Sequence, residues 1–254
     1  MISKNQIKHI ASLKLPKFRN EYNEFLVEGE KMVPELFNSI FKIKQIFALE
    51  DWISANQKMI PGNVELEKVS PKELGRISTL KTPNKVLAVV SIPETDLTSI
   101  KYNRLILVLD KLQDPGNLGT IIRTADWFGI KDIICSEDTV SLYNPKVIQS
   151  AMGSITRVNI HYTALKDFLK NIPKGLPVYG SLLEGKSLFQ EKLSNKGLII
   201  IGNESKGISR EIQSFVTEKI SIPSFAIDKH NQAESLNASL ASGIICAEFR
   251  RQNA

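Results

Sequence analysis

Two runs of consecutive apolar residues constrain the fold of this chain more than any other feature. Leu105 to Leu109 reads Leu-Ile-Leu-Val-Leu, and Leu198 to Ile201 reads Leu-Ile-Ile-Ile. A strand with one solvated face alternates apolar and polar residues, whereas a strand covered on both faces need not alternate. From Arg104 onward, such short strands alternate with segments of helical pattern, for example 118–128 and 234–251. The alternation predicts an α/β domain built on a mostly parallel sheet.

The first 96 residues predict a separate and smaller α/β domain. Its expected strands are 24–28, 43–49, 64–69 and 86–90, and its expected helices are 31–39, 52–57 and one opened by Pro71. The stretch from Ser91 to Ile100 holds a proline and several turn formers without a clear period, which indicates a linker. We therefore expect two domains, 1–96 and 97–254.

The chain carries a net charge of +6, and its N-terminus is basic. Residues 1–19 contain no acidic residue and five cations: Lys4, Lys8, Lys14, Lys17 and Arg19. Basic arms of this kind often contact a polyanion such as RNA. A solvated helix face explains the same residues, and charge alone favours that simpler reading.

Several protein classes are not expected. No apolar run approaches the ~18 residues that a membrane span needs. The first residues lack the apolar core and the cleavage site of a secretory signal. Cys135 and Cys246 each lie in an apolar stretch without metal-ligand or redox spacing, which indicates buried thiols in a reducing compartment. We expect a cytoplasmic protein.

The segment from Val108 to Ala125 is the first of three motifs that each follow a buried strand. Asn117 stands where an N-cap would precede a helix starting near Leu118. Arg123 is a polar residue on that helix, and glycines nearby permit close backbone approach. Each feature alone describes a capped helix with a surface arginine. Together they indicate a ligand site, because ligands of parallel sheets lie beyond the carboxyl ends of the strands.

The second motif, Gly197 to Ser209, argues against two nucleotide-binding classes. Gly202 and Gly207 have the separation of a phosphate-loop pair, but isoleucine and serine follow where a Walker motif needs lysine and serine or threonine. The chain also lacks the Gly-x-Gly-x-x-Gly pattern of a dinucleotide site. Glu204 has a structural explanation, since a carboxylate near a helix start favours the helix dipole.

The third motif combines Ile220 to Phe225 with Glu234 to Gly243. Ser235, Asn237 and Ser239 place small polar groups near the start of the last helix. The small residues that follow would allow close helix packing.

These three motifs together resemble the SpoU (TrmH) family of SPOUT methyltransferases. The matching features are Asp114 to Gly119 with Arg123, then Gly202 to Ile208, then Ile222-Pro223 followed by Glu234 to Ser239. Asn84 to Val90 and Phe25 to Glu30 resemble, more loosely, parts of the ribosomal-protein-like RNA-binding domain that often precedes the family's catalytic domain.

The resemblance implies a trefoil knot at the carboxyl end of the sheet, a homodimer and methyl transfer to a ribose 2′-hydroxyl of RNA. It also implies that S-adenosylmethionine binds in the knot, largely through backbone groups. By motif position, the residues expected to hold it are Gly180, Ser181, Gly202, Ile222 and Leu236. The donor's sulfonium already activates the methyl group, so no metal is expected.

The resemblance also implies roles for five side chains in catalysis. Arg123 is expected to hold an RNA phosphate or, as a hypothesis, to act as the base, although a guanidinium resists deprotonation. Asn117 is expected to fix the loop or the ribose, and Glu204 to orient Arg123 or the substrate. Ser235 and Asn237 are expected to complete the site.

The chain departs from the family between Pro223 and Glu234, where most members have a very short connection. Residues 224–233 form an extra loop beside the expected cofactor pocket. The loop contains His230, which is either a solvated loop histidine or an alternative base, because histidine titrates near neutral pH.

Ribosomal RNA is the expected substrate, because minimal members that modify transfer RNA often lack an N-terminal domain. Transfer RNA, antibiotic-resistance methylation and a non-catalytic RNA-binding role remain alternatives. The non-catalytic role would be signalled by loss of Asn117, Arg123, Glu204 or Asn237, and all four are present. Neither DNA nor a membrane is an expected partner.

Overall fold

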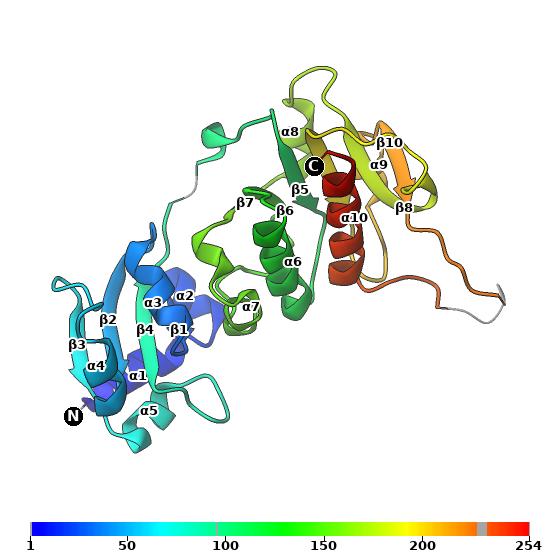
Figure 1. The fold of residues 1–254 in the computed structure, drawn as a ribbon. Coiled ribbons are helices and arrows are strands. Elements are labelled where there is room, and N and C mark those ends of the chain that lie inside the picture. The colour runs from blue at the N-terminus through cyan, green and yellow to red at the C-terminus, as the bar shows by residue number, and fades with distance from the viewer. Residues whose placement is uncertain (1, 95, 228–232, 254) are drawn as a thin grey trace. The chain divides into compact units, whose positions relative to one another are not determined.

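The computed structural model describes residues 2–94, 96–227 and 233–253 and divides into two compact units (Figure 1). The N-terminal unit comprises Met1–Glu94 together with Ser141–Arg157. The C-terminal unit comprises Thr95–Val140 and Val158–Ala254. The inserted segment Ser141–Arg157 therefore packs with residues of the first 94 positions. No local sequence pattern predicted this packing.

The C-terminal unit is built on a six-stranded sheet with the order β10-β8-β9-β5-β6-β7. Its strands are β5 (Leu105–Leu109), β6 (Asp132–Ser136), β7 (Asn159–Thr163), β8 (Val178–Ser187), β9 (Gly197–Ile201) and β10 (Glu218–Ser221). Every neighbouring pair runs parallel, and β5 and β9 are buried along their whole length. The parallel sheet expected from the apolar runs is confirmed, and the trefoil knot stays a prediction.

The helices of this unit are η2 (Leu97–Ser99), α6 (Pro115–Trp127), α8 (Leu165–Lys170), α9 (Arg210–Gln213) and α10 (Ala238–Gln252). They connect its strands, except η2, which precedes β5, and α10, which follows β10. The helices α6 and α10 lie side by side (Figure 1), and Arg250 Nε donates to the carbonyl oxygen of Phe128 at 2.7 Å. In the part of the chain that the structure describes, no helix has both the length and the apolar character to cross a bilayer.

Two expected helix starts are corrected by the structure. The N-cap of α6 is Asp114, whose side chain accepts from the amide of Asn117 at 2.8 Å, and proline occupies the first helical position. Asn117 is therefore a buried residue of the first turn and not the cap. The last helix begins at Ala238, because Asn237 caps it, and not at Glu234 as expected.

The connections of β5 and β9 leave the carboxyl edge of the sheet in opposite directions, and we call the region beyond these two strand ends the crevice. From β5 the chain passes through α6 to β6 on one side, whereas from β9 it passes through α9 to β10 on the other. Neighbouring parallel strands whose connections run in opposite directions leave room for a ligand between their ends. The residues that follow β5 and β9 meet there, as the hydrogen bond from Asn203 Nδ2 to the carbonyl oxygen of Lys111 shows.

The N-terminal unit contains a four-stranded mixed sheet with the order β1-β4-β2-β3. Its strands are β1 (Glu24–Glu28), β2 (Ile43–Ala48), β3 (Glu65–Lys68) and β4 (Val86–Ser91). Its helices are α1 (Lys4–Ser12), α2 (Pro16–Tyr22), α3 (Met32–Glu35), η1 (Leu36–Asn38), α4 (Glu50–Asn56), α5 (Pro71–Ile77), α7 (Pro145–Ala151) and η3 (Ser154–Thr156). The apolar run Val86 to Val90 forms the buried strand that was expected.

The basic N-terminus forms the helices α1 and α2 rather than an unstructured arm. Its four lysines are exposed, as a solvated helix face requires. Arg19 is buried, and its Nη1 donates to the carbonyl oxygens of Leu13 and Lys14 at 3.1 and 2.9 Å. Arg19 therefore stabilises the turn between the two helices and is not available to a ligand.

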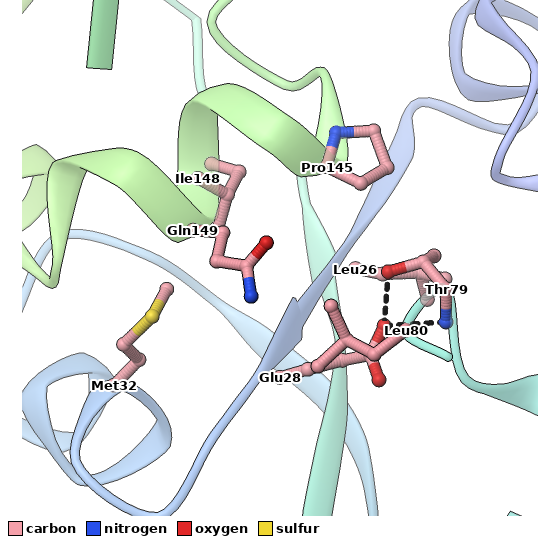
Figure 2. Close-up of a pocket in the computed structure, with 8 residues that line it drawn as sticks. All are labelled: Leu26, Glu28, Met32, Thr79, Leu80, Pro145, Ile148 and Gln149. Carbon is pink, nitrogen blue, oxygen red and sulfur yellow. Dashed lines mark hydrogen bonds between the residues drawn. The ribbon is translucent and has the colours of Figure 1, made fainter. Parts of the chain in front are cut away.

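A small pocket lies between β1 and α7 within the N-terminal unit (Figure 2). Nearby, the rings of Phe25 and Tyr143 lie 4.7 Å apart, and the Glu28 carboxylate accepts from Ser78 Oγ at 2.5 Å and from the Thr79 amide at 2.7 Å. The pocket encloses about 10 Å³. That volume suits a single water molecule, so the pocket is too small for a nucleotide.

Both cysteines are buried free thiols, as the sequence predicted. Burial raises the pKa of the Cys246 thiol to about 12, and it raises the pKa of Cys135 as well. Neither thiol is a nucleophile at neutral pH, because the thiolate is the reactive form.

A buried carboxylate at the start of β6 makes the stability of the C-terminal unit sensitive to acid. Asp132 accepts from Arg104 Nη2 at 2.5 Å and from Asn159 Nδ2 at 2.9 Å, and His161 Nε2 lies 3.8 Å away. Burial raises the pKa of Asp132, but these neighbours outweigh burial and bring it to about 2.

We expect Asp132 to contribute about 2 kcal/mol to the free energy of unfolding above pH 4. The contribution should disappear as the pH falls from about 4 to about 2, because the unfolded state binds the proton first. Urea titrations across this range should show a steeper loss for the wild type than for Asp132→Asn. The same change at the exposed Asp167 is the control, and equal slopes for all three proteins would contradict the assignment.

Candidate active site

Side chains from the three motifs meet in one chain of hydrogen bonds at the crevice. Asn237 Nδ2 donates to Asn117 Oδ1 at 2.8 Å, and Asn117 Nδ2 donates to Glu204 Oε1 at 3.0 Å. The three residues come from the cap of α10, the first turn of α6 and the loop after β9. The amide of Asn117 is both donor and acceptor here, a combination that neither aspartate nor leucine provides.

Glu204 fixes the loop that precedes α6. Its Oε1 also accepts from the amide of Asp114 at 3.0 Å, and its Oε2 accepts from the amide of Gln113 at 3.3 Å. Burial raises the pKa of Glu204, but the hydrogen bonds from Asn117 and the backbone amides outweigh burial and lower it. Glu204 is therefore a carboxylate at neutral pH. Its contacts among the described residues position Asn117 and the loop, and none reaches Arg123.

Asn237 uses both ends of its side chain. Its Oδ1 accepts from the amides of Ser239 and Leu240 at 3.0 and 3.3 Å, and from Ser239 Oγ at 2.6 Å. Its Nδ2 is then directed to Asn117. The cap of α10 thereby sets the position of the hydrogen-bond chain. If the helix started at Glu234, Asn237 would not be its cap and this chain would not form in the same way.

Arg123 and Ser235 lie outside this chain of hydrogen bonds. Arg123 is six residues beyond Asn117, which places it ~9 Å farther along α6 and about 240° around it. It is exposed, and no hydrogen bond or ion pair joins its guanidinium to any residue in the described ranges. Ser235 is exposed in the extended segment that leads to Asn237. Both side chains remain available to a ligand.

Three of the residues expected to hold the cofactor follow a strand or precede α10. Gly202 follows β9, Ile222 follows β10, and Leu236 precedes Asn237. Gly180 and Ser181 are instead the third and fourth of the 10 residues of β8, and Gly180 pairs with Ile200 near the end of β9. The backbone N–H and C=O groups of Ile222 and Leu236 make no hydrogen bond with the described part of the chain. Unpaired backbone groups at these positions fit a ligand that is held through the backbone.

Two of the expected cofactor residues are glycines because the fold requires them. A Cβ on Gly202 would lie 2.1 Å from the carbonyl carbon of Gly207 and 2.2 Å from the amide nitrogen of Ile208. A Cβ on Gly180 would lie 2.7 Å from a methyl carbon of Val216. The loop after β9 folds back onto its own start only because Gly202 has no side chain.

Two polar residues of the motifs received no role from the sequence, and the structure shows that they hold the loops together. Asp110 is buried, and its Oδ2 accepts from the amide of Ser209 at 2.7 Å. Asn203 Nδ2 donates to the carbonyl oxygen of Lys111 at 2.8 Å. The sequence feature that could have identified these two residues is their position, because each follows a fully apolar strand. The hypothesis that His230 is a base lies outside the described residues and stays a hypothesis.

Comparison with known proteins gives a family for both halves of the chain. Residues 104–247 match the model of the SpoU rRNA Methylase family, and residues 4–88 match the MRM3-like substrate binding domain. The chain is 30% identical to the 23S rRNA (guanosine(2553)-2′-O)-methyltransferase RlmP of Bacillus subtilis, over 98% of this chain and 97% of that protein.

Solved structures of related proteins share this fold over almost the whole length of the chain. A TrmH-family protein from Porphyromonas gingivalis superimposes with a TM-score of 0.90 at 34% identity, covering 99% of each chain. An AdoMet-bound rRNA methyltransferase from Sinorhizobium meliloti superimposes with a TM-score of 0.86 at 27% identity, covering 100% of this chain and 98% of the other. The motifs, the crevice that joins them and the match of more than half the chain show that this protein belongs to the SpoU rRNA methylase family.

Proposed function

We propose that this protein transfers the methyl group of S-adenosylmethionine to the 2′-hydroxyl of a ribose in ribosomal RNA. The observation that carries the proposal is the hydrogen-bond chain from Asn237 through Asn117 to Glu204. Arg123, farther along α6, is exposed and available to the RNA. The names of the relatives support the substrate, since RlmP is named as a 23S rRNA methyltransferase.

The cofactor is proposed to bind at the carboxyl ends of β9 and β10, next to Gly180 and Ser181 of β8. S-adenosylmethionine supplies a methyl group that its sulfonium already activates. The unpaired backbone groups of Ile222 and Leu236 would hold it, with Gly180, Ser181 and Gly202 forming the rest of the wall. The S. meliloti relative, which was solved with AdoMet, supports this choice.

The chain's own side chains have to orient the ribose and its phosphate. A 2′-hydroxyl is a poor nucleophile, so positioning and loss of its proton limit the reaction. Arg123 is proposed to hold a neighbouring phosphate through paired hydrogen bonds, a geometry that suits a guanidinium. Because Arg123 is exposed and a guanidinium resists deprotonation, the orienting role is favoured over the role of base. The exposed hydroxyl of Ser235 is proposed to complete the site.

We also propose that the protein is a homodimer through α6 and α10. Each helix exposes a large apolar side chain, Trp127 on α6 (85% exposed) and Leu240 on α10 (55%), and Leu236, which precedes α10, is 45% exposed. Exposed apolar surface of this kind is typical of an interface. A second copy suits the two helices, because both belong to the same unit and a twofold axis pairs like with like.

Replacing Trp127 by glutamate should convert the dimer to a monomer, because a carboxylate would be desolvated in an apolar interface. Sedimentation velocity at micromolar concentration measures the change directly. Ile40 is 75% exposed on the N-terminal unit, and Ile40→Glu should leave the dimer intact. A wild type that sediments as a monomer would refute the dimer.

The N-terminal unit is proposed to bind the RNA substrate, with the domain running over residues 1–96. The match to a substrate-binding domain and the exposed lysines of α1 and α2 support this role. Because ribosomal RNA is the proposed substrate, the protein is proposed to act in the cytoplasm, with neither DNA nor a membrane as partner.

Methyl transfer from tritiated S-adenosylmethionine tests the proposal. The acceptors should be ribosomal RNA and transfer RNA prepared from cells that lack this protein. We expect label in the large ribosomal RNA, in a dinucleotide that resists alkaline hydrolysis because its 2′-oxygen is methylated. Label in transfer RNA alone would show that transfer RNA, and not ribosomal RNA, is the substrate. Label on a base would refute ribose methylation, and no label in either RNA would refute the activity.

A further inference from the structure

Lys111, the second residue after β5, has a backbone conformation that lysine rarely adopts. Its φ is +58°, and the other described residues with positive φ that are not glycine are Asn23 and Met152. In this left-handed region a Cβ crowds the following carbonyl oxygen, so glycine or asparagine is favoured. Lys111 immediately follows Asp110 at the edge of the proposed active site.

The backbone of Lys111 is fixed by its neighbours and not by its side chain. Its amide donates to Ser136 Oγ at 2.8 Å, and its carbonyl oxygen accepts from Asn203 Nδ2 at 2.8 Å. Glycine would make both hydrogen bonds without strain. Residues in strained backbone conformations cluster at functional sites, where the surrounding structure imposes them. The side chain of Lys111 is therefore the feature that needs an explanation.

The ammonium group of Lys111 is only weakly engaged within the protein. Its Nζ lies 3.8 Å from Asp138 Oδ2, and the two side chains are 53% and 70% exposed. An exposed pair at that distance contributes little to stability, because water competes for both charges. The pKa of Glu211 is lowered mainly by its pairing with Lys166 and also by the charge of Lys111. Neither carboxylate holds the ammonium group closely, so it is available to a phosphate.

A second exposed lysine lies on the facing loop. Asn203 Oδ1 accepts from the amide of Lys206 at 3.1 Å, while Asn203 Nδ2 binds the carbonyl oxygen of Lys111. One asparagine thus holds the backbone at both lysines. Lys111 follows β5 and Lys206 follows β9, so the two flank the crevice that contains Asn117 and Glu204.

We propose that Lys111, assisted by Lys206, binds a phosphate of the RNA backbone next to the ribose that is methylated. This inference rests on the proposed function and adds a second phosphate contact to that of Arg123. Lys111 is a positioning residue, because it sets the register of the strand across the crevice and does not touch the reacting atoms. The ligand is the sugar–phosphate backbone, so the contact carries no base preference.

Two neutral substitutions that suit the backbone test the proposal. Lys111→Gly and Lys111→Asn remove the charge and tolerate positive φ, so neither should lower the melting temperature. With deproteinised, undermethylated large-subunit ribosomal RNA as the probe, KM for RNA should rise about tenfold, the effect of one lost charge-assisted hydrogen bond. KM for S-adenosylmethionine should not change. Lys111→Arg should keep most of the affinity.

The salt dependence of RNA binding identifies the lost contact as a phosphate. In filter binding, the slope of log affinity against log salt should become shallower by about 0.7 in the neutral variants, as expected for one phosphate on a single strand. Lys101→Asn is the matched control, because Lys101 is exposed and precedes β5 at the opposite edge of the sheet. It should leave both KM and the slope unchanged.

Asp138→Asn separates this proposal from a structural one. If Lys111 serves only to pair with Asp138, this variant will reproduce the loss seen in Lys111→Gly, and the proposal is overturned. Unchanged KM and slope in Lys111→Gly would also overturn it. Because filter binding needs no methyl transfer, an inactive wild type would refute the proposed reaction, while the slope would still decide whether Lys111 contacts a phosphate.

Discussion

Replacing Arg123 by alanine should reduce methyl transfer at least a hundredfold and leave the melting temperature unchanged. Its guanidinium is exposed and has no partner among the residues that the structure describes, so the substitution breaks no hydrogen bond or ion pair of the folded state. Two charge-assisted hydrogen bonds to a phosphate contribute about 3 kcal/mol together, which corresponds to a factor of ~100. Single-turnover rates with labelled S-adenosylmethionine measure the loss.

The variants Arg123→Lys and Arg123→Gln separate charge from geometry. Lysine keeps the charge but not the planar fork, so we expect an intermediate rate, and glutamine should resemble alanine. Near-normal methylation by Arg123→Ala would show that this residue does not orient the RNA. A large fall in melting temperature would show instead that α6 depends on it.

Replacing Gly202 by alanine should damage both stability and cofactor binding. The added Cβ would meet backbone atoms of Gly207 and Ile208 at 2.1 and 2.2 Å, and no side-chain rotation can relieve a backbone clash. Overpacking of this kind costs about 3 kcal/mol, which lowers the melting temperature by roughly 6 to 12 °C. Calorimetric titration with S-adenosylmethionine should show at least a tenfold weaker affinity, because the displaced loop borders the proposed cofactor site.

Gly207→Ala is the matched control on the same loop. Gly207 has a φ of +65°, but a Cβ there would meet no atom within 4 Å. The substitution therefore adds only backbone strain, about 1 kcal/mol. If the two variants were equally destabilised, the close approach at Gly202 would not be the reason for its glycine.

The sequence by itself determined the fold class, the strands and the family. Runs such as Leu105 to Leu109 and Val86 to Val90 are apolar at every position, and burial on both faces explains that pattern. The three motifs also placed the expected site at the ends of the parallel strands β5, β9 and β10. The strands and the fold class depend on local periodicity, and the family depends on short motifs; both are present in the chain before it folds.

The sequence did not determine where the helices start, because competing cap residues lie close together. Asp114 and Asn117 are both good N-cap residues, and the outcome depends on which one the following amides reach. Proline after Asp114 favours the earlier start, and the observed hydrogen bond from the Asn117 amide to Asp114 confirms it. For the same reason, α10 starts at Ala238 in the structure and not at Glu234 as expected.

Only the tertiary structure decided which polar residues meet. Asn237 is 120 positions from Asn117, and Glu204 is 87 positions away, yet the three form one chain of hydrogen bonds. Their contact depends on β9 pairing with β5, and strand order is a property of the whole sheet. The positive φ of Lys111 also arises there, because Ser136 and Asn203 impose it from neighbouring strands. Hydrogen bonds between distant loops form only after the sheet has brought the strand ends together, so no local pattern contains them.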